Sequence, residues 1–157
     1  MRSVQNIFRA AGIYGLIVTL PQYFRMEANG THFPPAITHP EYYFGFIGLI
    51  VVFQLLFLVI GHDPMHYRSL MPLCMLEKIA YADPASILYY QHKLAFPMFI
   101  AGAVDLVWGV LFLWAFYITG RVTISASRKT LVSAAARETR MDRATTLHEL
   151  GRESVRN

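Results

Sequence analysis

The sequence predicts an all-α integral membrane protein, a four-helix bundle followed by a polar, partly helical C-terminal cytoplasmic tail. Three observations lead to this fold class. Of the 157 residues, 55% are hydrophobic and 15% are charged, whereas a soluble domain carries about 25% charged residues. One run of twenty residues contains no charge at all. The basic residues gather near the C-terminus, so we assign the bundle to residues 1–120 and the tail to residues 121–157.

Two segments are the clearest membrane spans. Residues 42–61 are apolar and uncharged, and about 20 such residues at 1.5 Å each cross a hydrocarbon core of about 30 Å. Residues 94–119 are apolar apart from Asp105, and Arg121 follows as a boundary. These are the second and fourth predicted spans.

The first predicted span covers residues 6–24 and holds Arg9 near its start. A signal peptide is the alternative, but no small-residue cleavage site follows the apolar stretch, so we interpret the segment as uncleaved. Tyr23 and Phe24 fit the aromatic belt at a membrane surface.

The third predicted span, residues 70–90, is the least apolar, because it contains Glu77, Lys78 and Asp83. An amphipathic helix lying on the membrane surface is therefore its alternative. We expect Asp63 to cap this helix and Pro64 to occupy its first position. An even number of spans also places both termini on one side of the membrane.

The Lys and Arg residues near the span ends predict the orientation. One side carries most of them: Arg2, Arg9, Arg68, Arg121, Arg128 and Lys129. The other side carries Arg25 and Lys93. The first side is therefore expected to be cytoplasmic, with both termini inside.

The tail, residues 121–157, has eight basic and four acidic residues. This excess favours anionic lipid as a partner if the tail forms a surface helix. A disordered, solvated tail is the alternative. Because the basic excess lies beside a membrane domain, we do not expect nucleic acid to be a partner.

Ionisable residues at membrane depth form the candidate site, since each costs about 2.5–3.5 kcal/mol on insertion and usually faces a partner or a cavity. A turn at residues 91–93 would make the third and fourth spans antiparallel neighbours. Lys78 and Asp105 would then both lie about 20 Å from that turn, and we expect them to pair. Ala101 and Gly109 share the Asp105 face and would let another helix approach closely.

This pairing leaves Glu77 without a partner. The Arg9 side chain could reach toward Glu77 or extend to the lipid headgroups instead. The predicted polar cluster is therefore Arg9, Glu77, Lys78 and Asp105. A structural ion cluster that fixes helix register is one interpretation. A proton donor, or a polar anchor for a quinone or sterol, is the other. No catalytic residue is assigned, and Glu77 and Asp105 are the candidates.

No metal site is predicted. His62 and His66 are four residues apart, and His32, His39 and Glu41 fall in one loop. Neither set has the further ligands that zinc requires at recognisable spacing. The sequence also contains no phosphate-binding loop, dinucleotide fingerprint or nucleophile elbow. No cofactor is therefore predicted, although a quinone bound at the polar cluster is possible.

Residues 42–113 resemble small bacterial membrane proteins of the DoxX-like family. The matching features are the aromatic-rich second span, the passage DPMHYRSLMPLCMLEK at residues 63–78 and the passage AGAVDLVWGVLF at residues 101–112. The resemblance covers about half of the chain. It implies a four-helix bundle with Glu77, Lys78 and Asp105 as polar centre and a bacterial plasma (inner) membrane location. It implies little about activity, although some members of this family are described as membrane subunits associated with quinone-linked oxidation.

Three function classes remain open at this level. We expect a non-enzymatic accessory or structural subunit of a membrane complex, with other membrane subunits as partners. The first alternative is a membrane enzyme or binding protein for a lipid-soluble, quinone-like or sterol-like substrate that uses Glu77 and Asp105. The second alternative is a proton-coupled transporter.

Overall fold

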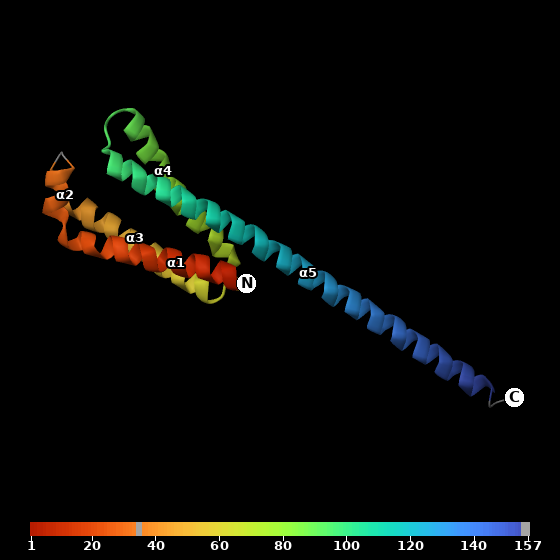
Figure 1. The fold of residues 1–157 in the computed structure, drawn as a ribbon. Helices are drawn as coiled ribbons and strands as arrows, with labels where there is room; N and C mark the ends of the chain where they lie inside the picture. Colours follow the sequence, from red (N-terminus) through yellow and green to blue (C-terminus); the bar gives the residue numbers. More distant parts are fainter. Residues whose placement is uncertain (34–35, 155–157) are drawn as a thin grey trace. The chain divides into compact units, whose positions relative to one another are not determined.

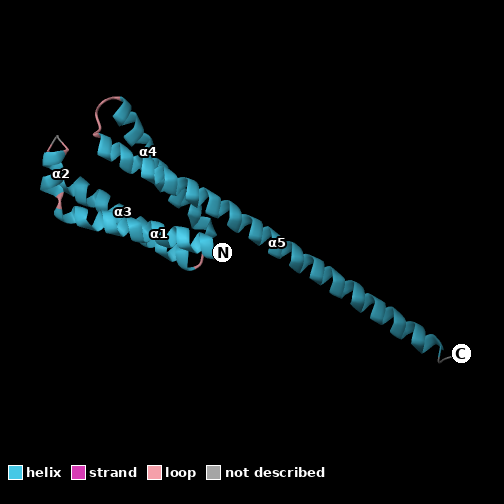
Figure 2. Ribbon diagram, in the orientation of Figure 1, coloured by secondary structure: helices cyan, strands magenta, loops and turns pink. Residues whose placement is uncertain are grey.

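The computed structural model describes residues 1–33 and 36–154, and every regular element among them is helical (Figures 1 and 2). This confirms the all-α class. The elements in chain order are α1 (Arg2–Thr19), η1 (Leu20–Phe24), α2 (Met26–His32), α3 (Pro40–His62), η2 (Arg68–Leu70), α4 (Met71–Tyr90) and α5 (Phe96–Ser154). The chain divides into two compact units, Met1–Thr119 and Gly120–Asn157.

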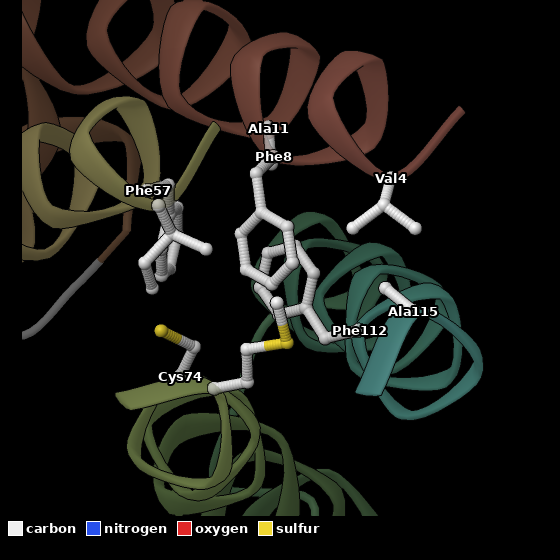
Figure 3. Packing of buried hydrophobic residues seen from close by; sticks show 9 residues of the cluster. Val4, Phe8, Ala11, Phe57, Cys74, Phe112 and Ala115 are labelled. Carbon is white, nitrogen blue, oxygen red and sulfur yellow. The ribbon is translucent and has the colours of Figure 1, made fainter. Parts of the chain in front are cut away.

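Four helices contribute to one hydrophobic core within Met1–Thr119. Phe8 of α1 stacks on Phe112 of α5 with ring centroids 4.5 Å apart. Phe57 of α3 meets the Phe112 ring edge-on at 4.9 Å. Cys74 of α4 closes the cluster from the remaining side, as Figure 3 shows. Aromatic pairs in these geometries add to the stabilisation that burial alone provides.

The α1–α3 contact is formed by small residues of α1. Ala11, Gly15 and Thr19 are all buried. A Cβ added at Gly12 would lie 2.8 Å from the backbone oxygen of Gln54, and one added at Gly15 would overlap the Gln54 side chain. Glycine is therefore needed at both positions for the helices to approach this closely.

The connection between α3 and α4 differs from the expected helix start. Asp63 is the C-cap of α3, and its Oδ1 accepts hydrogen bonds from the backbone N–H groups of Met65 and His66, at 3.2 and 3.1 Å. The prediction that Asp63 caps the third span is wrong, because its carboxylate stabilises a turn that precedes η2. The following helix begins at Met71, with Pro72 in its first turn, where a missing N–H costs nothing.

A Schellman-type cap ends α4. The N–H of His92 donates to the carbonyl of Tyr89 at 2.9 Å, and the N–H of Lys93 donates to the carbonyl of Leu88 at 2.9 Å. His92 has a φ of 57°, the left-handed conformation that this cap requires and that glycine usually supplies. The chain then reverses and enters α5 at Phe96.

Residues 121–154 of the tail are helical, since α5 continues to Ser154. For these residues the outcome corresponds to the helical alternative and not to the disordered one. The side chains of residues 123–130 and 134–157 lie outside the described part of the chain. Contact of the tail with anionic lipid stays a prediction.

In the described part of the chain, two helices are long and apolar enough to cross a membrane. They are α3, Pro40–His62, and the Phe96–Val122 portion of α5. They correspond to the second and fourth predicted spans. The helices α1 and α4 do not meet the same standard; α4 falls short because it contains Glu77, Lys78 and Asp83.

Candidate functional site

Lys78 and Asp105 form the ion pair that the sequence predicts. The Nζ atom of Lys78 lies 2.9 Å from Oδ1 of Asp105 and donates a hydrogen bond to it. Lys78, on α4, is only 5% exposed, and the Asp105 side chain, on α5, is partly buried. The pair therefore joins two helices inside the compact unit, where water screens charges much less than at a surface.

Glu77 also contacts this lysine and is not left over. Its Oε2 lies 3.1 Å from Lys78 Nζ, and its Oε1 accepts a hydrogen bond of 3.4 Å from the same Nζ. Oε2 is buried and accepts no hydrogen bond from the described residues. One ammonium thus faces two carboxylates, and the cluster carries one excess negative charge when all three groups are ionised.

Close packing surrounds the Lys78 side chain. A Cβ added at Gly109 would lie 3.6 Å from Lys78 Cβ, so the glycine keeps the α5 backbone near the lysine stem. About two turns from Gly109 toward the α4–α5 connection, a Cβ added at Gly102 would lie 3.3 Å from Ala85 Cβ and 3.4 Å from Ala82 Cα. These small residues set the distance between α4 and α5, and this distance allows the short Asp105 side chain to reach Lys78.

The aromatic ring of Phe57 covers the ammonium from the α3 side. Lys78 Nζ lies 5.1 Å from the centroid of this ring, within the range of a cation–π interaction. Phe57 is also a central member of the hydrophobic core. The charge cluster therefore lies directly beside the core and contacts three of its four helices.

Arg9 does not join the cluster. It is exposed, and its Cγ lies against Gly61 at the end of α3, 2.8 Å from where a Cβ would be. The prediction of a four-residue cluster is corrected to three residues, Glu77, Lys78 and Asp105. The reason is the register of α1 on α3, which places Arg9 beside the last turn of α3.

Two polar residues of the interior were not among the predicted site residues. Gln54 is 2% exposed and lies against Gly15. Arg68 has its guanidinium 4.0 Å from the centroid of the Phe116 ring and donates a hydrogen bond of 3.3 Å to the Phe116 carbonyl. In the sequence, Gln54 is a polar residue within an apolar run and Arg68 is a basic residue between two predicted spans. Neither feature identifies a partner.

The histidines do not gather. His39 pairs with Glu41 at 3.1 Å in an exposed position, and His32 bonds to the Ala28 carbonyl of its own helix. No three His, Cys, Asp or Glu side chains of the described residues come together in a way that could hold a metal ion.

Comparisons of the chain with protein-family models, with curated proteins and with solved structures found no match.

Proposed function

We propose that this chain is a small, non-enzymatic integral membrane protein, an accessory or structural subunit of a membrane complex. Its helices α1, α3, α4 and α5 all cross the bilayer. The single observation that carries this function is the charge cluster: Lys78 is buried and in contact with both Glu77 and Asp105. An ammonium whose hydrogen bonds are used within the protein fits a structural role better than a chemical one.

The distribution of polarity supports four spans. In the interior lie polar side chains such as Gln54 and Lys78. Apart from charged residues such as Arg9 and Asp83, the outer surface of the helices is largely apolar, and this includes the two helices that are less hydrophobic overall. The exposed residues there are Ile13, Ile17 and Val18 on α1 and Leu73, Leu76 and Ile79 on α4. Soluble monomers rarely expose such continuous apolar surface, whereas lipid is a favourable environment for it.

The depth of the cluster supports the same arrangement. Lys78 lies twelve residues before Tyr90, the last residue of α4, which is about 18 Å along the helix. A bilayer core of about 30 Å therefore places the cluster near its middle. There the ion pair and the cation–π contact neutralise a charge that would otherwise be very costly.

Topology can be tested by cysteine labelling. Cys74, the only cysteine, is buried, and Cys74→Ser gives a background for single cysteines at His39, Lys93 and Arg121. A membrane-impermeant maleimide should label positions 39 and 93 from the outside of intact cells and position 121 only after the membrane is opened. If position 39 is labelled from the same side as position 121, and position 93 from the opposite side, α4 does not cross the membrane. That result would contradict the four-span topology.

The role of the chain can be tested by purification in a gentle detergent, followed by native mass spectrometry. We expect other membrane subunits in a fixed ratio. A lone protein that carries an apolar small molecule would contradict the proposal.

One observation favours a second function. Oε2 of Glu77 is buried without a hydrogen bond, and such an acceptor could hold the hydroxyl of a quinone-like or sterol-like ligand. Native mass spectrometry distinguishes this alternative, because Glu77→Gln would then release a bound apolar molecule. Tyr81→Phe, one turn away on α4, is the matched control. The resemblance to DoxX-like proteins stays a hypothesis and is not needed for either function.

A further inference from the structure

Asp83 has a different position from the other charged residues of α4. Glu77 and Lys78 point into the helix core, but Asp83 is exposed. Among the described residues, none forms a salt bridge or hydrogen bond with the Asp83 carboxylate. The charge cluster therefore does not account for it.

The depth of Asp83 makes its exposure costly. It lies seven residues before Tyr90, the end of α4, or about 10 Å along the helix. Tyr89 at that end stacks on Phe99 with ring centroids 4.4 Å apart, and such aromatic groups mark the membrane interface. If α4 crosses the bilayer, a short acidic side chain about 10 Å below that interface cannot reach the headgroups.

A second acceptor lies on the same face. Pro84 follows Asp83 inside α4 and has no N–H to donate to the carbonyl of Ala80, four residues earlier. Ala80 and Pro84 are both exposed. The face therefore presents a carboxylate and a carbonyl one turn apart, between the exposed apolar residues Ile79 and Ile87.

We propose that this face of α4 docks a transmembrane helix of a different membrane protein, and that a Lys or Arg of that helix pairs with Asp83. The inference rests on the proposed function and specifies the chemistry of the partner. Two neighbouring acceptors on an apolar surface require a donor-rich cation, and Arg, with several N–H groups, could serve both. Isoleucines on either side supply the apolar contacts, and unpaired charges in spans usually face such a partner.

A second copy of the chain is a poorer occupant. Pairing the same face of two copies about a twofold axis would place Asp83 near its own counterpart, and like charges repel. Lys78 is the nearest basic residue along the chain, but it is buried and paired with Glu77 and Asp105. The next one, Lys93, lies beyond the end of α4, well above the depth of Asp83.

The test is site-specific photo-crosslinking in membranes of the source cells, with benzoylphenylalanine at Ile79 in the full-length chain. Leu55, an exposed residue of α3, is the matched control position. We expect one protein adduct from Ile79 and only lipid adducts from Leu55. Asp83→Leu should lower the yield of the protein adduct at least tenfold. The adduct should contain Lys or Arg in a transmembrane helix, and exchange of the two charges between the partners should restore the yield.

Several results would overturn the inference: an adduct that Asp83→Leu leaves unchanged, a partner without a basic residue in its span, an adduct with a second copy, or lipid adducts alone. Thermal unfolding in detergent should show that Asp83→Leu still folds, since among the described residues its carboxylate has no salt bridge or hydrogen bond to lose.

Labelling of Asp83→Cys in the Cys74→Ser background separates two kinds of failure. Reaction with an impermeant maleimide in sealed vesicles would mean that α4 faces water, and the proposed spans would fail together with the docking face. Protection without a protein adduct would overturn the docking face alone.

Discussion

In the α1–α3 pair, a neutral amide fills the closest approach of the two helices, because Gly12 and Gly15 lie directly against Gln54. In the α4–α5 pair, the closest approach is formed by Gly102 on Ala82 and Ala85, and an ion pair follows at Lys78 and Asp105. Both pairs bring backbones together with small residues. They differ in the interaction that a single substitution would disrupt. In the α1–α3 pair it would be the close backbone contact, and in the α4–α5 pair it would be the balance of charges.

The largest effect is expected where one charge is removed from the α4–α5 pair. In a Glu77→Gln background, the single variant Asp105→Leu should lower the free energy of unfolding by about 3 kcal/mol, because it leaves the buried Lys78 ammonium without a carboxylate. The double variant Lys78→Met/Asp105→Leu in the same background should recover most of this loss, since no charge of the cluster remains. Unfolding in mixed micelles measures both variants. Equal losses for the single and the double variant would show that the charges do not act as a pair.

The next effect concerns backbone contact in the α1–α3 pair. Gly12→Ala should cost about 1–3 kcal/mol, because the new methyl group meets the Gln54 backbone oxygen at 2.8 Å. Gly45→Ala is the matched control on α3, since a Cβ there meets nothing within 4 Å. Thermal unfolding in the same detergent compares the two variants. If Gly45→Ala lowered the stability as much as Gly12→Ala does, close backbone contact could not be the cause of the loss at Gly12.

The two carboxylates of the cluster should differ in importance. Glu77→Gln should cost about 1 kcal/mol or less, because its oxygens lie farther from Lys78 Nζ, at 3.1 and 3.4 Å, than the Asp105 oxygen does, and one negative charge is in excess. Asp105→Asn should cost more, since it weakens the 2.9 Å contact. Chemical unfolding of both isosteric variants provides the ranking, and the reverse order would identify Glu77 as the principal partner.

The smallest effect is expected at the α4–α5 turn. His92→Gly should raise stability by about 0.5 kcal/mol, because His92 has a positive φ of 57° that glycine adopts without strain. Gln91→Gly, at the preceding residue with a φ of −80°, should lower it. Thermal unfolding of the two variants tests the sign, and stabilisation by both would point to the turn's general flexibility instead.

Several features could be predicted from the sequence because they depend on local composition. The helical class and the two most apolar helices follow from long runs of apolar residues. The Lys78–Asp105 pair followed from counting residues on either side of a short turn, since two antiparallel helices with equal rise bring equal distances to the same height.

Other features depended on contacts that residue spacing does not encode. Arg9 was expected in the cluster, but the register of α1 on α3 places it against Gly61. Asp63 was expected to start a helix, but it stabilises a turn after α3. In the first case a neighbouring helix, distant in the sequence, decides which direction the residue faces, and in the second a local turn does.

The sequence by itself determined that the chain is helical and largely apolar, and it determined which charges lie within its helices, because helix formation and hydropathy are properties of short segments. Only the tertiary structure decided which of those charges are neutralised inside and which are not. Lys78 meets Glu77 and Asp105, whereas Asp83, five residues further along the same helix, points outward. This distinction depends on the rotation of α4 about its axis, which is set by packing against α3 and α5.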